Sequence, residues 1–325
     1  MRPIRILGTG EALPRRVVTS AEVEALCGVP SGWAERRAGV RERRWASDGE
    51  TNAILGATAA RAALDAAALS ARDVDLVLNA SGTAQQPIPD NAALIAAELG
   101  LSGVAAFSVH ATCLSFLAAL DVAADRVALG RAKRVLIVSS DVGSVGLNFG
   151  EPESACLIGD GAAAVIVGPS DGASGLHVSR FETYPEGAHL TEIRGGGTWR
   201  TPSHPDATPT DFLFRMAGLG VLKLARDVAP SFLERLSPGL STGLGDIDVV
   251  VPHQASLAGL RLMERFGWPR ERVATTLETL GNVIAASIPL TLHRAITSGA
   301  LARGQRTLLI GTGAGFSIGG AILTY

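Results

Sequence analysis

Three residues of different chemical types stand at positions where they could share one reaction: Cys113, His253 and Asn282. Cys113 lies in SVHATCLSFLAAL, where a strand-like segment gives way to an apolar helical pattern. The N–H groups and dipole of a helix start stabilise an anion, which predicts a lowered pKa for the thiol. A lone cysteine can equally be a small buried hydrophobic residue, so its neighbours must decide between the two interpretations.

His253 and Asn282 each follow a segment that should end near a ligand site. His253 comes directly after the apolar run in DVVVPHQAS. Ligands of open α/β sheets bind at the carboxyl ends of strands, although a histidine there can also be a simple cap. Asn282 lies in LGNVIAASIPL before a helical run, where asparagine is also an ordinary turn or N-cap residue. An amide that faces the thiol, with an imidazole between them, would be more than a cap.

The elements that must position these residues alternate between short apolar strands and alanine-rich helices. This alternation is typical of α/β layers with buried sheets. The stretch 184–211, with three consecutive glycines and four prolines, is the one long irregular segment, and loops of that length are usually functional covers. Strands are predicted at 74–78, 135–138, 163–167, 249–251 and 307–310, and helices at 114–129 and 288–297.

Two pairs of segments echo each other and predict an internal duplication. RDVDLVLNASGT resembles GDIDVVVPHQAS, which lies 173 residues later. The helix that starts near Cys113 leads into ALGRAKRVLIVSSD, and the one that starts near Asn282, 169 residues later, leads into SGALARGQRTLLIGTG. Two echoes in the same order indicate a duplicated α/β unit. We therefore expect two halves, residues 1–169 and 170–325, with Asn282 in the position equivalent to Cys113.

Composition argues against several other classes of protein. The 325 residues are 47% hydrophobic and 18% charged, with a net charge of −2. A near-neutral chain without a basic run does not suggest a nucleic-acid partner. No apolar stretch approaches the roughly 18 residues that a membrane helix needs. The opening MRPIRILGTG lacks the plan of a signal peptide, so we expect a cytoplasmic protein.

Cysteine and glycine motifs indicate neither a metal nor a nucleotide. Cys27, Cys113 and Cys156 are too widely spaced for a disulfide framework or a metal knuckle. GDGAAAVIV is not followed by the lysine of a P-loop, and GTGAGFSIGG is not followed by a βαβ unit. Both segments are interpreted as tight turns whose N–H groups can point into a site.

Taken together, the motifs resemble the β-ketoacyl-ACP synthase III-like condensing enzymes of the thiolase superfamily, over nearly the whole chain. The resemblance implies a thiolase-like five-layered αβαβα fold built from two duplicated halves. It also implies a homodimer whose active site lies where the two halves meet. The segments that carry it are ALPRRVVTSAEVE, residues 33–43, ATCLSF, GDGAAAV, VPHQAS, GNVIAASIP and GAGFSIGGAIL.

The resemblance also implies a role for each site residue. Cys113 would accept the acyl group, and His253 and Asn282 would hold the thioester carbonyl of a second substrate. The backbone N–H groups of Cys113 and Ala314 would form the oxyanion hole. The substrates would be thioesters of acyl carrier protein or coenzyme A, without a metal or other cofactor. The residues implied to contact substrate are Trp33, Arg37, Ile88 and Phe316.

Three of these substrate contacts have a specific implied function. Trp33 and Arg37 would sandwich the adenine of coenzyme A by stacking and cation–π attraction. Ile88 stands where a bulky aromatic residue limits chain length in the short-chain priming enzymes. We therefore expect a wider acyl chamber here, built in part by the partner subunit, although Ile88 could also serve only as interface packing.

Several positions depart from the family pattern. Glu151 and Glu153 stand where an arginine would face the phosphates of coenzyme A, and an acidic segment would repel a pyrophosphate. The amide and basic side chains expected after PHQA are missing as well. These departures suit a pathway-specific member that receives chains from a carrier protein. The other departures are Ser115, Ala314, Val283, Ile284, Ser256 and Ala258.

The sequence thus predicts an enzyme that stores an acyl group on Cys113 and joins it to a second thioester in a Claisen condensation, decarboxylative in form. Its pathway would be fatty-acid or, preferably, polyketide or other secondary-metabolite biosynthesis. One alternative is an acyltransferase of the same fold that passes the acyl group to an alcohol or amine. Another is a non-catalytic partner subunit of a biosynthetic complex. Asn282 favours carbon–carbon chemistry, because simple transfer needs no clamp for an enolate.

Overall fold

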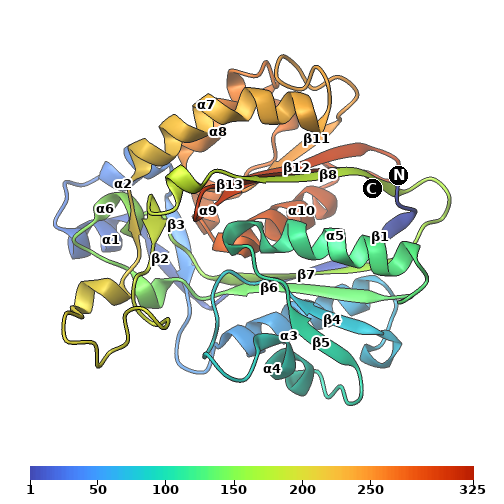
Figure 1. The fold of residues 1–325 in the computed structure, drawn as a ribbon, viewed down its shortest axis with the longest axis horizontal. Coiled ribbons are helices and arrows are strands. Elements are labelled where there is room, and N and C mark those ends of the chain that lie inside the picture. Colours follow the sequence, from blue (N-terminus) through green and yellow to red (C-terminus); the bar gives the residue numbers. More distant parts are fainter.

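A computed structural model describes residues 1–325 as five layers of helices and sheets, which confirms the predicted αβαβα architecture. Figure 1 shows two sheets with a layer of helices between them and further helices on the outer face of each sheet. The middle layer holds α5 (Ser115–Ala128) and α10 (Ser287–Thr297). The outer helices are α7 (Gly218–Leu236) and α8 (Leu257–Glu264) on one side, and α3 (Asn52–Ala66) and α4 (Asn91–Glu98) on the other.

The two sheets repeat one strand order, as the duplication predicted. The first runs β1-β7-β6-β4-β5 and the second β8-β13-β12-β11. In both, antiparallel strands extend a parallel pair, β4 with β6 and β11 with β12, and the first sheet adds β5, which is parallel to β4 and has no counterpart in the second. The proposed boundary between the halves follows directly after β7. The strands are β1 (Ile4–Ala12), β4 (Leu76–Asn79), β5 (Ala105–Ser108), β6 (Val135–Asp141), β7 (Gly161–Pro169), β8 (Gly175–Thr183), β11 (Val249–Pro252), β12 (Arg306–Gly313) and β13 (Ser317–Thr324).

All the strands and helices that were predicted by range are present, with ends shifted by a few residues. The predicted irregular stretch, residues 184–211, holds only short turns and β9 (Thr191–Glu192), which pairs with β10 (Arg215–Met216). No helix of the structure combines the length and the apolar character that a membrane crossing requires.

Small residues let the helices approach the sheets closely. An added Cβ at Gly8 of β1 would lie 2.4 Å from the carbonyl oxygen of Ala63 in α3. At Gly10 it would lie 2.4 Å from the carbonyl oxygen of Ala59, so neither position has room for a side chain. The abundance of alanine and glycine therefore follows from close helix–strand packing. The largest core cluster lies between the sheets, around the buried faces of α5 and α10.

A smaller unit packs beside the five layers, at the left of Figure 1, and carries the Trp33 segment. Its hub is Arg43, which is fully buried and donates hydrogen bonds to the Cys156 carbonyl at 2.6 Å and the Ser20 hydroxyl at 3.1 Å. Burial lowers the pKa of Arg43. The elements of this unit are β2 (Arg16–Thr19), α1 (Ser20–Cys27), α2 (Trp33–Ala38), β3 (Glu42–Trp45) and α6 (Pro152–Ala155).

Candidate active site

Cys113 lies in a strained turn directly before α5. The turn is a short 3-10 helix, η2 (Thr112–Leu114), and Thr112 has a φ of 52°. This left-handed conformation is costly for a β-branched residue and is typical of functional sites. Ser115 closes the turn, because its hydroxyl accepts a hydrogen bond from the Ala111 N–H at 2.9 Å and donates to the Thr112 carbonyl at 2.7 Å. The departure at Ser115 thus has a structural role.

The end of β12 lies against this turn and brings the second half of the chain to Cys113. A Cβ at Gly313 would lie only 2.7 Å from the hydroxyl of Thr112, so glycine is required for this approach. The backbone N–H groups of Ala314 and of Cys113 itself both hydrogen-bond to the ionised sulfur. The two predicted oxyanion donors therefore converge on the Cys113 sulfur.

Burial raises the pKa of the Cys113 thiol to about 12, and the negative charge of Asp141 adds to this rise. The residue keeps some exposed surface, but its sulfur is enclosed by protein. The N–H groups of Ala314 and Cys113 act in the opposite direction and offset only part of the effect. The prediction of a lowered pKa was therefore wrong, because lost hydration outweighs the helix start. The thiol of the free enzyme is neutral at pH 7.

Asp141, the last residue of β6, was missed by sequence reasoning. Its carboxylate is fully buried and accepts hydrogen bonds from the backbone N–H groups of Gly82 at 2.8 Å, Thr83 at 2.7 Å and Ala286 at 3.0 Å. It thereby joins the loop after β4 to the start of α10. Burial raises the pKa of Asp141 to about 6. A signal was present in the sequence, since this carboxylate ends the buried run VLIVSS.

His253 follows β11 and is only 5% exposed. Its backbone N–H donates to the Ile310 carbonyl of the neighbouring strand at 2.8 Å. Burial lowers the pKa of His253 to about 4, so the imidazole is neutral at pH 7. The Nδ1 atom is buried and has no hydrogen-bond partner within the chain. A neutral imidazole of this kind can donate one N–H to an oxyanion or accept a proton.

Asn282 is held beside the His253 segment with a defined amide orientation. Its Nδ2 donates to the Ala255 carbonyl at 3.3 Å, and the Ala255 N–H in turn donates to the His253 carbonyl at 2.9 Å. Its Oδ1 accepts from the Ile284 N–H at 2.9 Å. The oxygen is thus engaged by the backbone, while the second N–H of the amide remains available for a ligand.

The turn before α10 repeats the Cys113 turn and corrects the predicted equivalence. It is also a short 3-10 helix, η7 (Ile284–Ala286), whose first residue has a φ of 46°. In both turns a serine at the start of the next helix, here Ser287, accepts a hydrogen bond from the backbone N–H four residues earlier. The residue equivalent to Cys113 is therefore Ala285. The prediction that Asn282 occupies this position was wrong, because Asn282 lies before the repeated turn.

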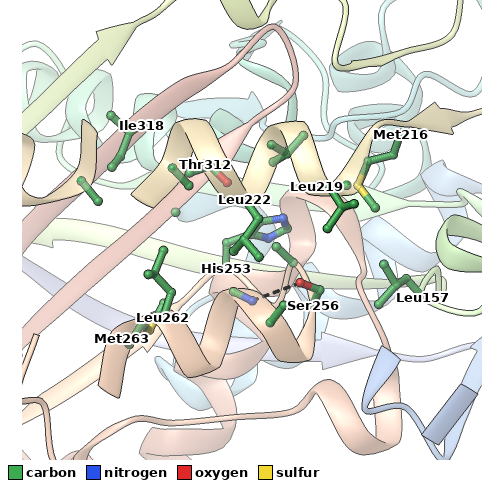
Figure 2. Close-up of a pocket in the computed structure, with 18 of the residues that line it drawn as sticks. Leu157, Met216, Leu219, Leu222, His253, Ser256, Leu262, Met263, Thr312 and Ile318 are labelled. Atoms are coloured by element: carbon green, nitrogen blue, oxygen red, sulfur yellow. Dashed lines mark hydrogen bonds between the residues drawn. The ribbon is translucent and has the colours of Figure 1, made fainter. Parts of the chain in front are cut away.

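A largely apolar cavity of about 260 Å³ lies beside His253. Figure 2 shows His253 in its middle, with Leu157 and Met216 toward one end and Leu262 and Ile318 toward the other. α7 and α8 contribute much of the lining. The site thus has a passage that reaches the imidazole.

The predicted substrate contacts divide between this cavity and other places. Trp33 and Arg37 line the cavity together with His253. Ile88 is 85% exposed on the loop before α4, and Phe316 is buried with its ring centroid 6.2 Å from that of Tyr184. Ile88 and Phe316 do not line the cavity, nor do Cys113, Asn282 and Ala314. Contact of Ile88 and Phe316 with substrate stays a prediction.

The departures at the cavity mouth also have defined positions. Glu153 lines the cavity with Arg37, whereas Glu151 accepts a hydrogen bond from the Met216 N–H at 3.4 Å. Ser256 is the N-cap of α8, since its hydroxyl accepts from the Gly259 N–H at 3.1 Å. The mouth therefore carries one cation and one anion rather than a cationic cluster.

Comparison with known proteins identifies the family. The family model described as 3-oxoacyl-[acyl-carrier-protein] synthase III matches residues 107–186, which include Cys113. Its C-terminal counterpart matches residues 240–325, which include His253 and Asn282. The β-ketoacyl-[acyl-carrier-protein] synthase III of Thiobacillus denitrificans is 37% identical, and the alignment covers 99% of each chain. The chain belongs to the 3-oxoacyl-[acyl-carrier-protein] synthase III family.

Further relatives show how varied this family is. Acetoacetyl CoA synthase NphT7 of a Streptomyces species is 34% identical over 99% of this chain and 98% of that protein. The solved structure of a priming β-ketosynthase from a polyketide biosynthetic pathway has a TM-score of 0.89 and 32% identity, covering 99% of this chain and 96% of that one. As a synthase III, the chain is an acyl-transferring condensing enzyme with the thiolase fold, which confirms the predicted resemblance.

Proposed function

We propose that this synthase III stores an acyl group on Cys113 and condenses it with a second thioester held by His253 and Asn282. In the first half-reaction the sulfur attacks the donor thioester, and the donor thiol leaves with the cysteine proton. In the second, loss of CO2 leaves its electron pair on the α-carbon of the second thioester as an enolate. That carbon attacks the acyl carbonyl, and the bond to the Cys113 sulfur breaks.

The observations that carry this proposal are the two backbone N–H groups at the Cys113 sulfur, the unpartnered ring nitrogen of His253 and the free amide N–H of Asn282. Two tetrahedral intermediates and one enolate each develop charge on an oxygen, and each needs a donor that is already in place. The N–H groups of Cys113 and Ala314 serve the tetrahedral intermediates. The neutral imidazole of His253 and the free amide N–H of Asn282 serve the enolate.

The high pKa of the thiol adds a requirement to the first half-reaction. With a pKa of about 12, on the order of one thiol in 10⁵ is ionised at pH 7. The proton must therefore leave as the sulfur attacks. The departing thiolate is its final acceptor, and the unpartnered nitrogen of His253 can relay it.

The substrates we propose are thioesters, with carrier-protein thioesters preferred over those of coenzyme A for the second step. Arg37 and Glu153 share the cavity mouth, so the field there offers little attraction to a pyrophosphate. A carrier protein presents a pantetheine arm without that group. We further propose a cytoplasmic homodimer that needs no metal or other cofactor and acts in a pathway-specific synthesis of polyketide or fatty-acid type.

The experiment is intact-protein mass spectrometry with a panel of acyl thioesters, followed by a chase with ¹³C-labelled malonyl-carrier protein. The proposal predicts one added acyl group, its loss during the chase, and a labelled β-ketoacyl product that is two carbons longer. Loss of the acyl group to an alcohol or amine, without a new carbon–carbon bond, would favour the acyltransferase alternative. No acylation by any donor would support the non-catalytic alternative.

A further inference from the structure

The cavity beside His253 continues well beyond the imidazole. Its outer end is marked by exposed residues, namely Arg37, Glu153 and Leu219. Its inner end is marked by Leu233, Phe266, Trp268 and Ile318, none of which is more than 8% exposed. In Figure 2 the labelled residues Leu262, Met263 and Ile318 lie on the far side of His253 from Met216 and Leu157. We call the part beyond His253 the inner branch.

The inner branch is apolar because of how α7 faces the second sheet. Leu222, Ala225, Ala229 and Leu233 recur at helical spacing and all line the cavity. Alanine at two of these positions leaves space where a larger side chain would close it. The indole N–H of Trp268 is already satisfied by the Leu240 carbonyl at 3.0 Å. Thr312, which lies on the Ile318 side of His253 in Figure 2, adds one hydroxyl to the cavity lining, so the branch is apolar apart from this group and suits an apolar ligand.

Charge and position decide which part of a substrate can enter the branch. The two charged residues that line the cavity, Arg37 and Glu153, both lie at its outer end. His253 lines the cavity and Cys113 does not. An apolar group in the branch thus lies beside His253, the residue assigned to the second thioester.

We propose that the inner branch binds an alkyl chain carried on the α-carbon of the second thioester. This inference rests on the proposed function, because it assigns His253 to that thioester. The substrate class is an alkylmalonyl thioester. Loss of CO2 leaves the electron pair on the substituted α-carbon, which forms the new bond to the acyl carbon while the bond to the Cys113 sulfur breaks. The product is an α-alkyl-β-ketoacyl thioester.

The size of the expected preference follows from burial of the methylene groups of the alkyl chain. Each buried methylene strengthens binding about fourfold, so a hexyl chain gains far more from the branch than the hydrogen of malonyl does. Wild-type enzyme should therefore use hexylmalonyl-carrier protein with a kcat/KM at least ten times that of malonyl-carrier protein.

The test measures that ratio in variants of one helix. Ala229→Phe places a ring in the branch and should lower the hexylmalonyl-to-malonyl ratio at least tenfold. Val228→Phe is the matched control, since the neighbouring Val228 does not line the cavity, and it should leave the ratio within twofold. Because Ala229→Phe could fail to fold, Met263→Ala provides a second variant that enlarges the branch. It should shift the preferred chain from hexyl to octyl.

The same samples distinguish failure of this inference from failure of the proposed function. Mass spectrometry of acyl-Cys113 reports the proposed function independently of the second substrate. If acyl-Cys113 forms but wild-type enzyme does not prefer hexylmalonyl, the inference is overturned and the proposed function stands. It is also overturned if Ala229→Phe changes the chain length accepted on Cys113. If no donor acylates Cys113, both fail together.

Discussion

The turns that precede α5 and α10 have the same backbone but different neighbours. Each is a short 3-10 helix with a positive φ at its first residue and a serine that closes it. Beside the turn of Ala285, strand β6 ends in Asp141, whose carboxylate accepts a hydrogen bond from the N–H of Ala286. Beside the turn of Cys113, the equivalent strand β12 ends in Gly313, where a side chain would collide with Thr112.

This difference shows how two copies of one turn can serve different purposes. The turn of Ala285 binds a carboxylate of the protein itself, whereas the turn of Cys113 is left open to a substrate. The start of a helix favours a negative charge wherever it occurs. In the second half the protein's own carboxylate, Asp141, occupies that position. In the first half glycine leaves the position open, so the N–H groups around Cys113 remain available for substrate oxygen.

The largest predicted effect comes from removing the thiol of Cys113. Cys113→Ala should abolish covalent acylation and lower condensation on the order of 10³-fold or more, because no other cysteine has two N–H donors at its sulfur. Intact mass and product formation measure both losses. Cys27→Ala is a control that should acylate normally. Acylation that survives in Cys113→Ala would contradict the assignment of the acyl group to Cys113.

The next effect separates the two half-reactions. His253→Ala and Asn282→Ala should still self-acylate, more slowly in the histidine variant, but lose condensation at least about 10²-fold because the enolate loses a donor. Single-turnover acylation and product release are measured separately. If folded His253→Ala loses acylation entirely, the imidazole is the essential base for Cys113.

A third prediction concerns the negative charge of Asp141, which lies beside the turn of Ala285. Asp141→Asn removes the negative charge that helps to raise the pKa of Cys113, so that pKa should fall below about 12. The pH dependence of Cys113 alkylation by iodoacetamide, followed by mass, reports the shift. An alkylation profile identical to wild type would show that burial alone sets the thiol pKa.

The same variant, Asp141→Asn, should also change how the free energy of unfolding depends on pH. The pKa of Asp141, about 6, is raised from its ordinary 3.8, so its stabilisation is present below pH 3.8 and lost as pH rises through 6. The pKa of His253, about 4, is lowered from 6.5, so its stabilisation is present above pH 6.5 and lost as pH falls through 4. In wild type the two contributions oppose each other between pH 4 and 6.

In Asp141→Asn the contribution of His253 to the pH dependence of stability should therefore no longer be opposed by that of Asp141. The free energy of unfolding of the variant should fall more than that of wild type as pH is lowered from 6.5 to 4, because the opposing change at Asp141 has been removed. Urea unfolding at several pH values across this range gives both curves. Parallel curves would contradict the assignment of the opposing effect to Asp141.

Much of the fold and the chemistry was accessible from the sequence, because both depend on local patterns. The buried strands are apolar runs, and His253 stands directly after one of them, whereas Cys113 stands shortly before an apolar helix. The segments ATCLSF and VPHQAS also carry the family resemblance. The duplication was visible as well, since the equivalent strands keep a common order and spacing.

What escaped prediction depends on contacts between distant parts of the chain. The pKa of Cys113 is set by burial and by Asp141, which no local pattern reports. The sequence does not reveal the true offset between the two turns, because alanine-rich segments contain few markers of register. The cavity beside His253 arises from the spacing between α7, α8 and the second sheet, and only the folded arrangement defines it.

The most direct test of the account maps the acyl group within the protein. Enzyme is incubated with an acyl thioester, digested, and analysed by peptide mass spectrometry before and after addition of malonyl-carrier protein. The account predicts the acyl group on the peptide that contains Cys113, and its disappearance as a β-ketoacyl product forms. Acyl label on Cys27 or Cys156, or label on Cys113 that malonyl-carrier protein never removes, would contradict it.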